Sequence, residues 1–310
     1  MTVDSMFQYH LYGLWIDSVL ALPGAPIQVR KDRDADLTIL WSPLHAGGDP
    51  EVAITIPAAG PGDIAFGVAP DGSHAMLWEG EITMLISPHA DLLRVYCGEK
   101  KLEYVPTVLV GVALGFVLQL RNTLCLHATV LGSSGHTIAI MGDSGSGKSS
   151  AATALVRSGA RLYSDDVAAI ELAPDGRCHV QHGCMGLRLC ADSAAALLDS
   201  RHPLEAVPYL GKLLWNLSGQ GLDSAPPRLD ALYWLDSTDS SHGLEVSAPL
   251  GPREALGYVL RSWYPPQSRH LMNSQRLEQM HRLILALPIH VIRYEKRWDN
   301  LPLLQELFLQ

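Results

Sequence analysis

One stretch of eight residues restricts the fold of this chain more than any other. Residues 142–149 read Gly-Asp-Ser-Gly-Ser-Gly-Lys-Ser and fit the pattern G-x-x-x-x-G-K-[ST], whose backbone N–H groups wrap around phosphate. The apolar run 136–141 predicts a buried strand before the loop, and the alanine-rich run 149–157 predicts a helix that ends at Gly159. Glycines permit the positive φ angles of such a loop, and the first helical turn directs N–H groups at the anion. The sequence therefore predicts a strand–loop–helix unit that binds phosphate groups.

The loop and the first turn of the helix supply a set of predicted nucleotide ligands. In such sites the loop lysine contacts the β- and γ-phosphates, and the hydroxyl that follows it binds Mg²⁺. Lys148 and Ser149 occupy these two positions, so we expect ATP and Mg²⁺ as cofactors. A glycine-rich turn can match the pattern by chance, but the flanking strand and helix argue against that. The predicted nucleotide-binding residues are Gly142, Asp143, Ser144, Gly145, Ser146, Gly147, Lys148, Ser149 and Ser150.

Composition excludes several classes of partner. The net charge is −9 without a dense Lys/Arg block, which argues against nucleic acid, because phosphate contacts need a basic surface. The apolar run Val105–Leu120 is too short to span a bilayer comfortably, so we expect a buried helix and no membrane contact. The cysteines are odd in number and include no CxxC pair, so they do not suggest a set of disulfide bonds. This favours a reduced, cytoplasmic setting. They are Cys97, Cys125, Cys178, Cys184 and Cys190.

The chain divides into two predicted domains. Residues 1–104 are β-rich, with short apolar runs separated by clusters of Gly, Pro and Asp. Residues 105–310 alternate strand and helix patterns around the phosphate loop, which is typical of an α/β domain. The first alternating run expected in this domain continues from 7 through 19, and further strands are expected at 37–41, 52–56, 64–68, 75–78, 82–86 and 92–96.

Two adjacent carboxylates, Asp165 and Asp166, follow the predicted helix closely. A Mg²⁺-nucleotide site needs an acidic side chain near the metal, and phosphoryl transfer to a hydroxyl needs a base near the acceptor. Neighbouring side chains on an extended strand point to opposite sides, so one carboxylate would face the metal and the other the acceptor. An isolated Asp-Asp pair is more often a solvated turn. Beside a phosphate loop, the catalytic interpretation is favoured.

Three segments in this order carry a resemblance to a known family. They are Leu126-His127-Ala128, the loop 142–149, and residues 158–166, which read Ser-Gly-Ala-Arg-Leu-Tyr-Ser-Asp-Asp. Together they resemble the catalytic domain of the HPr kinase/phosphorylase family, which transfers phosphate from a nucleotide to a protein serine. The resemblance covers about residues 124–172. It implies an α/β P-loop kinase domain of the HPr kinase / PEP carboxykinase-like type over residues 105–310, preceded by the smaller β-rich domain.

The resemblance also implies a role for each matching residue. Lys148 and Ser149 would hold the phosphates and Mg²⁺. Asp165 would be the base on the serine hydroxyl, and Asp166 would be a metal ligand. His127 would lie near the transferring phosphate, although a histidine in such a strand is more often a core residue when judged alone.

One signature of the family is missing, which narrows what the resemblance implies. Residues 182–189 read His-Gly-Cys-Met-Gly-Leu-Arg-Leu where an acidic-x-Arg-Gly-x-Gly stretch is usual, so neither phosphorylase activity nor HPr as substrate follows. The layout is similar to the HPr-kinase-like proteins of lasso-peptide gene clusters, which begin with a YGL-type strand, here Tyr12-Gly13-Leu14, and carry a GLRL element, here 186–189. Such kinases phosphorylate the C-terminal serine of a precursor peptide. The resemblance thus implies that peptide as substrate. The β-rich domain, in which the sequence shows no catalytic constellation, is the region that we expect to bind it.

Arg188, within the GLRL element, is a candidate substrate ligand. Its guanidinium can bind a phosphate or a peptide carboxylate through two parallel hydrogen bonds, and a structural arginine is an equally common alternative. A zinc site is disfavoured, because the available Cys and His spacing fits no standard zinc site. The residues in question are Cys178, His179, His182, Cys184 and Cys190.

Two other functions stay open. A small-molecule kinase acting on free serine would need a closed pocket and no peptide groove. A nucleotide-dependent sensor would hydrolyse slowly and transfer nothing, and the double Asp disfavours it because a sensor needs no acceptor base. The family resemblance further implies that the chain can form homo-oligomers.

Overall fold

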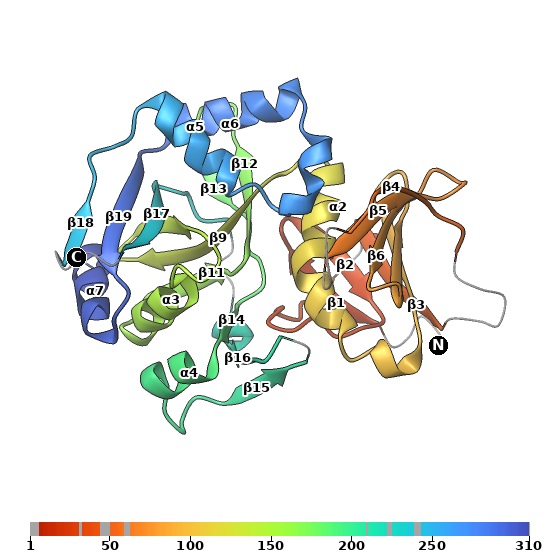
Figure 1. Ribbon diagram of the computed structural model, residues 1–310, viewed down its shortest axis with the longest axis horizontal. Helices are drawn as coiled ribbons and strands as arrows, with labels where there is room; N and C mark the ends of the chain where they lie inside the picture. Colours follow the sequence, from red (N-terminus) through yellow and green to blue (C-terminus); the bar gives the residue numbers. More distant parts are fainter. Residues whose placement is uncertain are drawn as a thin grey trace.

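The structure is a computed structural model that describes residues 6–30, 33–43, 50–58, 63–208, 210–221, 225–238 and 243–309. Its elements form a mixed α/β fold, as the sequence predicts, and they are arranged around three sheets (Figure 1). None of the described helices has both the length and the apolar composition needed to cross a lipid bilayer.

Eight strands come first in the chain, and strands and helices are mixed from α1 onward. The strands are β1 (Phe7–Leu11), β2 (Leu14–Ser18), β3 (Leu37–Pro43), β4 (Ala53–Ile56), β5 (Ile64–Val68), β6 (His74–Trp78), β7 (Ile82–Ile86), β8 (Leu92–Cys97), β9 (Leu124–Ser133), β10 (His136–Met141), β11 (Arg161–Ser164), β12 (Val167–Leu172), β13 (Cys178–Val180), β14 (Gly186–Leu189), β15 (Leu204–Val207), β16 (Lys212–Asn216), β17 (Ala231–Thr238), β18 (Leu244–Val246) and β19 (Ile289–Glu295). The helices are α1 (Val105–Val108), α2 (Leu114–Leu120), α3 (Lys148–Arg157), α4 (Ala191–Leu197), α5 (Pro252–Arg261), α6 (Ser274–Ala286) and α7 (Leu301–Leu309). A π-helical segment, η3 (Leu109–Ala113), joins α1 to α2, and 3₁₀ turns lie at η2 (Glu99–Lys101), η4 (Ser218–Gln220), η5 (Pro266–Leu271) and η6 (Trp298–Asn300).

The N-terminal half forms one eight-stranded sheet with the order β1-β2-β3-β8-β7-β6-β5-β4. The strands predicted from 37–41 onward are each present within two residues of their expected bounds, whereas the continuous run predicted over 7–19 is divided into β1 and β2. The alternation that predicted them is visible in β8, where Leu93, Val95 and Cys97 are buried and the residues between them are half-exposed. Tyr12 and Gly13, both with positive φ, turn the first alternating run back on itself as the β1–β2 hairpin.

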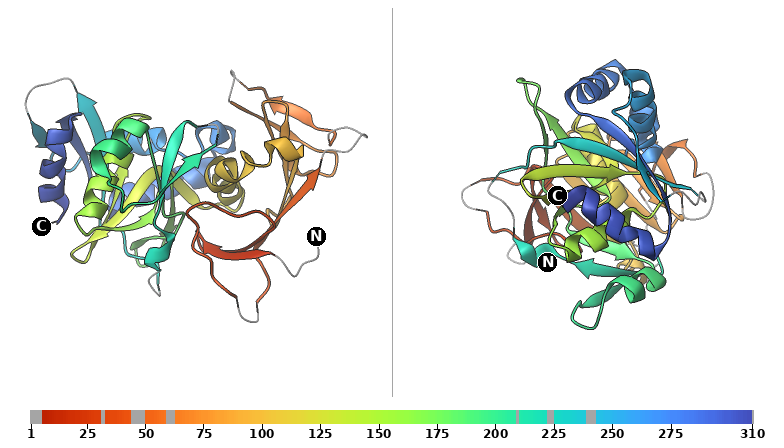
Figure 2. Two further views of the ribbon diagram at one scale, coloured as in Figure 1. Left: turned by 90° about the horizontal axis from the view of Figure 1, so that it is seen from below. Right: turned by 90° about the vertical axis from the view of Figure 1, so that its left-hand side faces the viewer.

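The predicted helix over residues 105–120 is confirmed as the continuous run α1–η3–α2. It packs in one apolar core with the N-terminal sheet, where Phe116 lies 4.9 Å from Phe66 between ring centroids. The same core includes Cys125 and Val167 from the second sheet. Figure 1 and the left view of Figure 2 show α2 at the junction of the two large sheets.

The central sheet has the order β13-β12-β9-β10-β17-β19-β18, with β11 also paired to β9. Strands β10, β17 and β19 are parallel neighbours, and the remaining pairs are antiparallel. Apolar residues of α5 and α6 pack with one face of this sheet, and those of α3 and α7 pack with the other. Because both faces are covered, its strands read as continuous apolar runs and not as alternating ones.

A third, antiparallel sheet has the order β14-β16-β15. Leu187, Trp215 and Leu204 lie opposite one another across the three strands and join the core around α3. Side chains one position along point to the other face of the sheet, and these include Arg188 and Lys212. That face contributes to the candidate site described below.

Backbone hydrogen bonds connect the N-terminal half to the segment between β13 and β14. The Tyr12 N–H donates to the His182 carbonyl at 2.6 Å, and the Met185 N–H donates to the Gly24 carbonyl at 2.7 Å. The Cys184 N–H also donates to the Tyr12 hydroxyl at 3.4 Å. The segment 182–185 is therefore held by the N-terminal half.

Candidate active site

The loop predicted to bind phosphate connects strand β10 to helix α3. Gly147 adopts φ +98° immediately before the helix, and a Cβ there would clash with the Tyr294 hydroxyl. A Cβ on Gly142, which has φ +152°, would lie 2.8 Å from the Leu235 carbonyl oxygen. These two positions require glycine, so the local geometry explains why the loop pattern has glycine at both.

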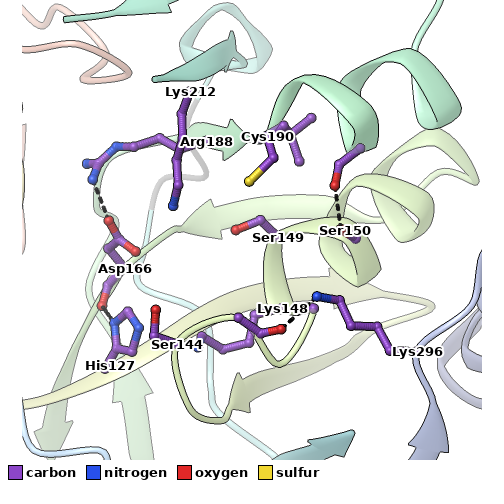
Figure 3. A pocket seen from close by; sticks show the side chains of 14 residues that line it. His127, Ser144, Lys148, Ser149, Ser150, Asp166, Arg188, Cys190, Lys212 and Lys296 are labelled. Atoms are coloured by element: carbon purple, nitrogen blue, oxygen red, sulfur yellow. Dashed lines mark hydrogen bonds and ion pairs between the residues drawn. The ribbon is translucent and has the colours of Figure 1, made fainter. Parts of the chain in front are cut away.

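Residues of the loop line a cavity of about 200 Å³ at the start of helix α3 (Figure 3). The cavity lies between the loop, the turn after β11 and the small sheet, and residues of β9, of α4 and of the segment after β19 also line it. The predicted residues that line it are His127, Ser144, Gly145, Gly147, Lys148, Ser149, Ser150, Asp166 and Arg188. The structure thus brings together most of the side chains that the sequence selected.

Four predicted residues lie outside the cavity lining. Gly142 is packed inside the loop, and the Ser146 side chain is buried beneath it. Asp143 is exposed and forms an ion pair with Arg261 at 2.5 Å. Asp165 is buried, with 5% of its surface exposed.

Lys148 is folded against its own loop. Its Nζ donates to the carbonyl oxygens of Gly142 at 2.7 Å and Asp143 at 3.0 Å. Burial lowers the pKa of Lys148, and the nearby carboxylates of Asp166 and Asp165 oppose that shift. A phosphate bound in the loop would offer this ammonium a charged acceptor in place of two carbonyls.

The double Asp occupies a strained turn between β11 and β12. Asp166 has φ +66°, a left-handed conformation that is uncommon for residues other than glycine and that often marks functional sites. The turn directs Asp166 into the cavity and Asp165 inward, whereas the prediction assumed an extended strand with one carboxylate toward the metal and the other toward the acceptor. The Thr129 hydroxyl donates to the Asp165 carboxylate at 2.6 Å, and the Asp165 N–H donates to the Cys184 carbonyl at 2.9 Å.

The two carboxylates differ in acidity. Burial, together with the charge of Asp166, raises the pKa of Asp165 to about 6. Burial also opposes ionisation of Asp166, but the positive charge of Arg188 and weaker contributions from three other side chains outweigh it and lower the pKa of that carboxyl. Asp166 is therefore ionised well below neutral pH, whereas Asp165 loses its proton only near pH 6.

Arg188 and His127 position Asp166 from two sides. The Arg188 guanidinium forms an ion pair with the Asp166 carboxylate at 2.6 Å, and both side chains are largely shielded from solvent. The His127 Nδ1 lies 3.2 Å from the Asp166 carbonyl oxygen, and the His127 ring stacks on Tyr264 at 5.5 Å between centroids. Burial lowers the pKa of His127, which favours the neutral ring. Figure 3 shows these contacts along one wall of the cavity.

Sequence reasoning missed several residues that line the cavity. Lys212 and Lys296 come from β16 and from the segment after β19, far from the loop in the chain, and no local motif marks them. Cys190 was considered only as a zinc ligand, and it lines the cavity at the start of α4. The other missed residues are Leu189 and Ser193.

The oxygen donors of the cavity fit a magnesium ion better than a zinc ion. The Ser149 hydroxyl and the ionised Asp166 carboxylate line the same cavity, and Mg²⁺ in nucleotide sites uses one or two carboxylates together with substrate phosphates. Within the described ranges, no group of three or more His, Cys, Asp and Glu side chains is arranged to hold a metal ion. Ser149 and Asp166 are thus the residues that would hold Mg²⁺.

Fold and site together define a mixed α/β protein with a glycine-rich loop facing an ionised carboxylate. No protein-family model and no curated protein matches the chain. Among solved structures, the Hpr(Ser) kinase/phosphatase from Coxiella burnetii is similar over 59% of this chain and 87% of that one, with a TM-score of 0.31 and 14% sequence identity. We take neither fold nor function from a likeness of this size.

Proposed function

We propose that this chain is a Mg²⁺- and ATP-dependent kinase that transfers the γ-phosphoryl group to a serine hydroxyl. One observation carries the proposal: a single cavity contains the glycine-rich loop with its lysine and, on the facing wall, the ionised Asp166 paired with Arg188. A site that only binds a nucleotide has no need for a buried carboxylate–guanidinium pair opposite the phosphates. Phosphoryl transfer needs both parts, since catalysis there rests on positioning and charge neutralisation.

In the proposed reaction, the serine hydroxyl oxygen attacks the γ-phosphorus in line with the bond to the β-phosphate. The new O–P bond forms as the γ-phosphorus–oxygen bond to the β-phosphate breaks, and ADP leaves with that electron pair. Lys148 and the N–H groups at the start of α3 bind the phosphates, and Arg188 stabilises negative charge across the cavity. Bound Mg²⁺ neutralises charge on the phosphates.

The hydroxyl proton passes to one of the two carboxylates. Asp166 is the carboxylate within the cavity, so it can contact the acceptor or the metal without rearrangement. Asp165 has the pKa better suited to a base, at about 6, but it must leave Thr129 to reach the acceptor. The base role predicted for Asp165 and the metal role predicted for Asp166 both stay predictions, and the pH–rate profiles of the two Asp→Asn variants separate them.

The proposed acceptor is the C-terminal serine of a precursor peptide, an assignment based on the YGL and GLRL elements. Both elements lie near the site: Tyr12 contacts the segment 182–185, and the second element is strand β14 with Arg188. Free serine is the alternative acceptor, because it presents the same hydroxyl beside a carboxylate.

Mass spectrometry of a reaction mixture tests this proposal. The protein is incubated with Mg²⁺-ATP and either a precursor-like peptide ending in serine or free serine, and a mass gain of one phosphoryl group is expected on the peptide's last residue. Asp166→Asn should reduce that gain at least about 100-fold. The matched control is Asp199→Asn, which changes an exposed carboxylate that pairs with Arg201 and does not line the cavity.

Other outcomes would overturn the proposal in distinct ways. A gain on free serine alone would replace the peptide acceptor with a metabolite. Release of ADP without a gain on either acceptor would favour a nucleotide-dependent sensor.

A further inference from the structure

Among the cations that line the cavity, Lys212 is the one whose side chain forms no hydrogen bond or ion pair within the described part of the chain, although the Asp166 carboxylate attracts its charge at longer range. The other three are engaged: the ammonium groups of Lys148 and Lys296 each donate to loop carbonyls, and Arg188 is paired with Asp166. Lys212 is half-buried, so its ammonium gives up part of its hydration without a compensating bond. A lysine held in this way at a cavity wall points to an anion that it binds there.

The position of Lys212 separates it from the phosphate loop. It is the first residue of β16, and the register with β14 puts its side chain on the same face of the small sheet as Arg188. Figure 3 shows its side chain directed into the cavity from the wall opposite Lys148, with Arg188 beside it. Lys148 and Lys296 approach from the loop side, where the nucleotide phosphates are proposed to bind. Lys212 therefore faces the acceptor.

We infer that Lys212 binds the carboxylate that lies next to the hydroxyl of the proposed acceptor, and that Lys212 thereby distinguishes a terminal serine from an internal one. This inference rests on the proposed kinase function and names a residue that would recognise its acceptor. A terminal serine carries its carboxylate two carbon atoms from the carbon that bears the hydroxyl, so both groups fit within a cavity of about 200 Å³. The C-terminus of a peptide and free serine share this chemistry.

Steady-state kinetics with paired acceptors test the inference. The acceptors are a peptide ending in serine, the same peptide with a C-terminal amide, free serine and serine amide, each with Mg²⁺-ATP. For the wild-type chain, amidation should lower kcat/KM on the order of tenfold to a hundredfold, because a charge-assisted hydrogen bond is lost. In Lys212→Met, activity on the acid should fall by the same factor, while activity on the amide should be nearly unchanged. The preference for the acid would then disappear, and Lys212→Arg should restore part of it.

Lys296→Met is the matched control on the loop side of the cavity. It should lower activity on acid and amide equally and raise the KM for ATP, which leaves the ratio between acceptors unchanged. The same pattern in Lys212→Met would overturn the inference, because it would assign Lys212 to the nucleotide. Equal rates on acid and amide in the wild type would also overturn it and would leave the kinase proposal intact. An absence of transfer to every acceptor would refute the kinase proposal and the carboxylate site together.

The two sources of the carboxylate are separated by the same data. A peptide kinase turns over the peptide acid and leaves free serine largely unreacted, and a metabolite kinase does the reverse. In either case the acid-to-amide ratio must depend on Lys212.

Discussion

Asp165→Asn should stabilise the fold at neutral pH, although it alters a candidate catalytic residue. The Asp165 carboxyl is buried beside a second carboxylate, and its pKa in the folded chain is raised from 3.8 to about 6. A carboxyl with a raised folded pKa destabilises the folded state once the pH is high enough to ionise it. Asparagine carries no charge and its side-chain oxygen can still accept the Thr129 hydroxyl. The substitution thus removes the free-energy cost of a buried charge and keeps the hydrogen bond from Thr129.

The size of this effect follows from the pKa difference. A shift from 3.8 to about 6 corresponds to about 3 kcal/mol at pH 8, where Asp165 is ionised in both states. At pH 5 the folded carboxyl is mostly protonated, and the cost falls to about 1.5 kcal/mol. For a chain of 310 residues the entropy of unfolding is about 0.65 kcal/mol/K, so the expected rise in Tm is about 5 °C at pH 8 and about 2 °C at pH 5.

Thermal unfolding followed by circular dichroism at pH 5, 6, 7 and 8 measures both numbers. Asp166→Asn is the matched variant, because it removes the carboxylate whose pKa is lowered and leaves the shielded Arg188 unpaired. It should lower the stability by about 3 kcal/mol at pH 8, opposite in sign to Asp165→Asn. A Tm for Asp165→Asn that lies below the wild type at pH 8, or a difference that does not change with pH, would refute the reasoning.

Two glycine substitutions give further tests. Gly183→Ala would push a methyl group into the Ser164 hydroxyl and the Tyr12 ring, so it should destabilise the fold by about 2–3 kcal/mol, visible as a lower midpoint of urea unfolding; an unchanged midpoint would contradict the packing described here. Gly147→Ala should abolish ATP binding by calorimetry, because it combines an unfavourable φ with a clash against the Tyr294 hydroxyl, and retained affinity would show that the loop does not need this conformation.

The sequence predicted those elements of the fold that are encoded by residues close together in the chain. The run 136–141, the loop and the helix to Arg157 appear as expected, because apolar strand, glycine turn and alanine-rich helix are each encoded within ten residues or so. The N-terminal strands were also predictable, since one face is buried and alternation marks it. Strand β17 was not predictable from the sequence, because a central strand covered on both faces shows no alternation of apolar and polar residues. Its parallel pairing with β10 and β19 in the structure identifies it.

The residues of the candidate site can also be separated into those that a local motif predicts and those that it does not. Lys148 and Ser149 belong to a contiguous motif. Lys212 and Lys296 are brought to the cavity by the order of strands in the sheets, which no short stretch of sequence encodes. The double Asp was found from sequence, but its geometry was not. The prediction assumed an extended strand, and the left-handed backbone of Asp166 instead places one carboxylate in the cavity and the other beneath it.

The hydrogen bonds between the N-terminal half and the segment 182–185 have a practical consequence. Tyr12 and Gly24 hold that segment, and the Cys184 carbonyl in turn accepts from the Asp165 N–H. Helix α2 also packs against the N-terminal sheet, so removal of the residues before 105 would expose an apolar helix. It would also remove the hydrogen bonds that hold the segment next to the Asp165–Asp166 turn. A shorter version of this chain, or a transfer of the candidate site to another scaffold, should therefore include the first hundred residues as part of the folded unit that supports the site.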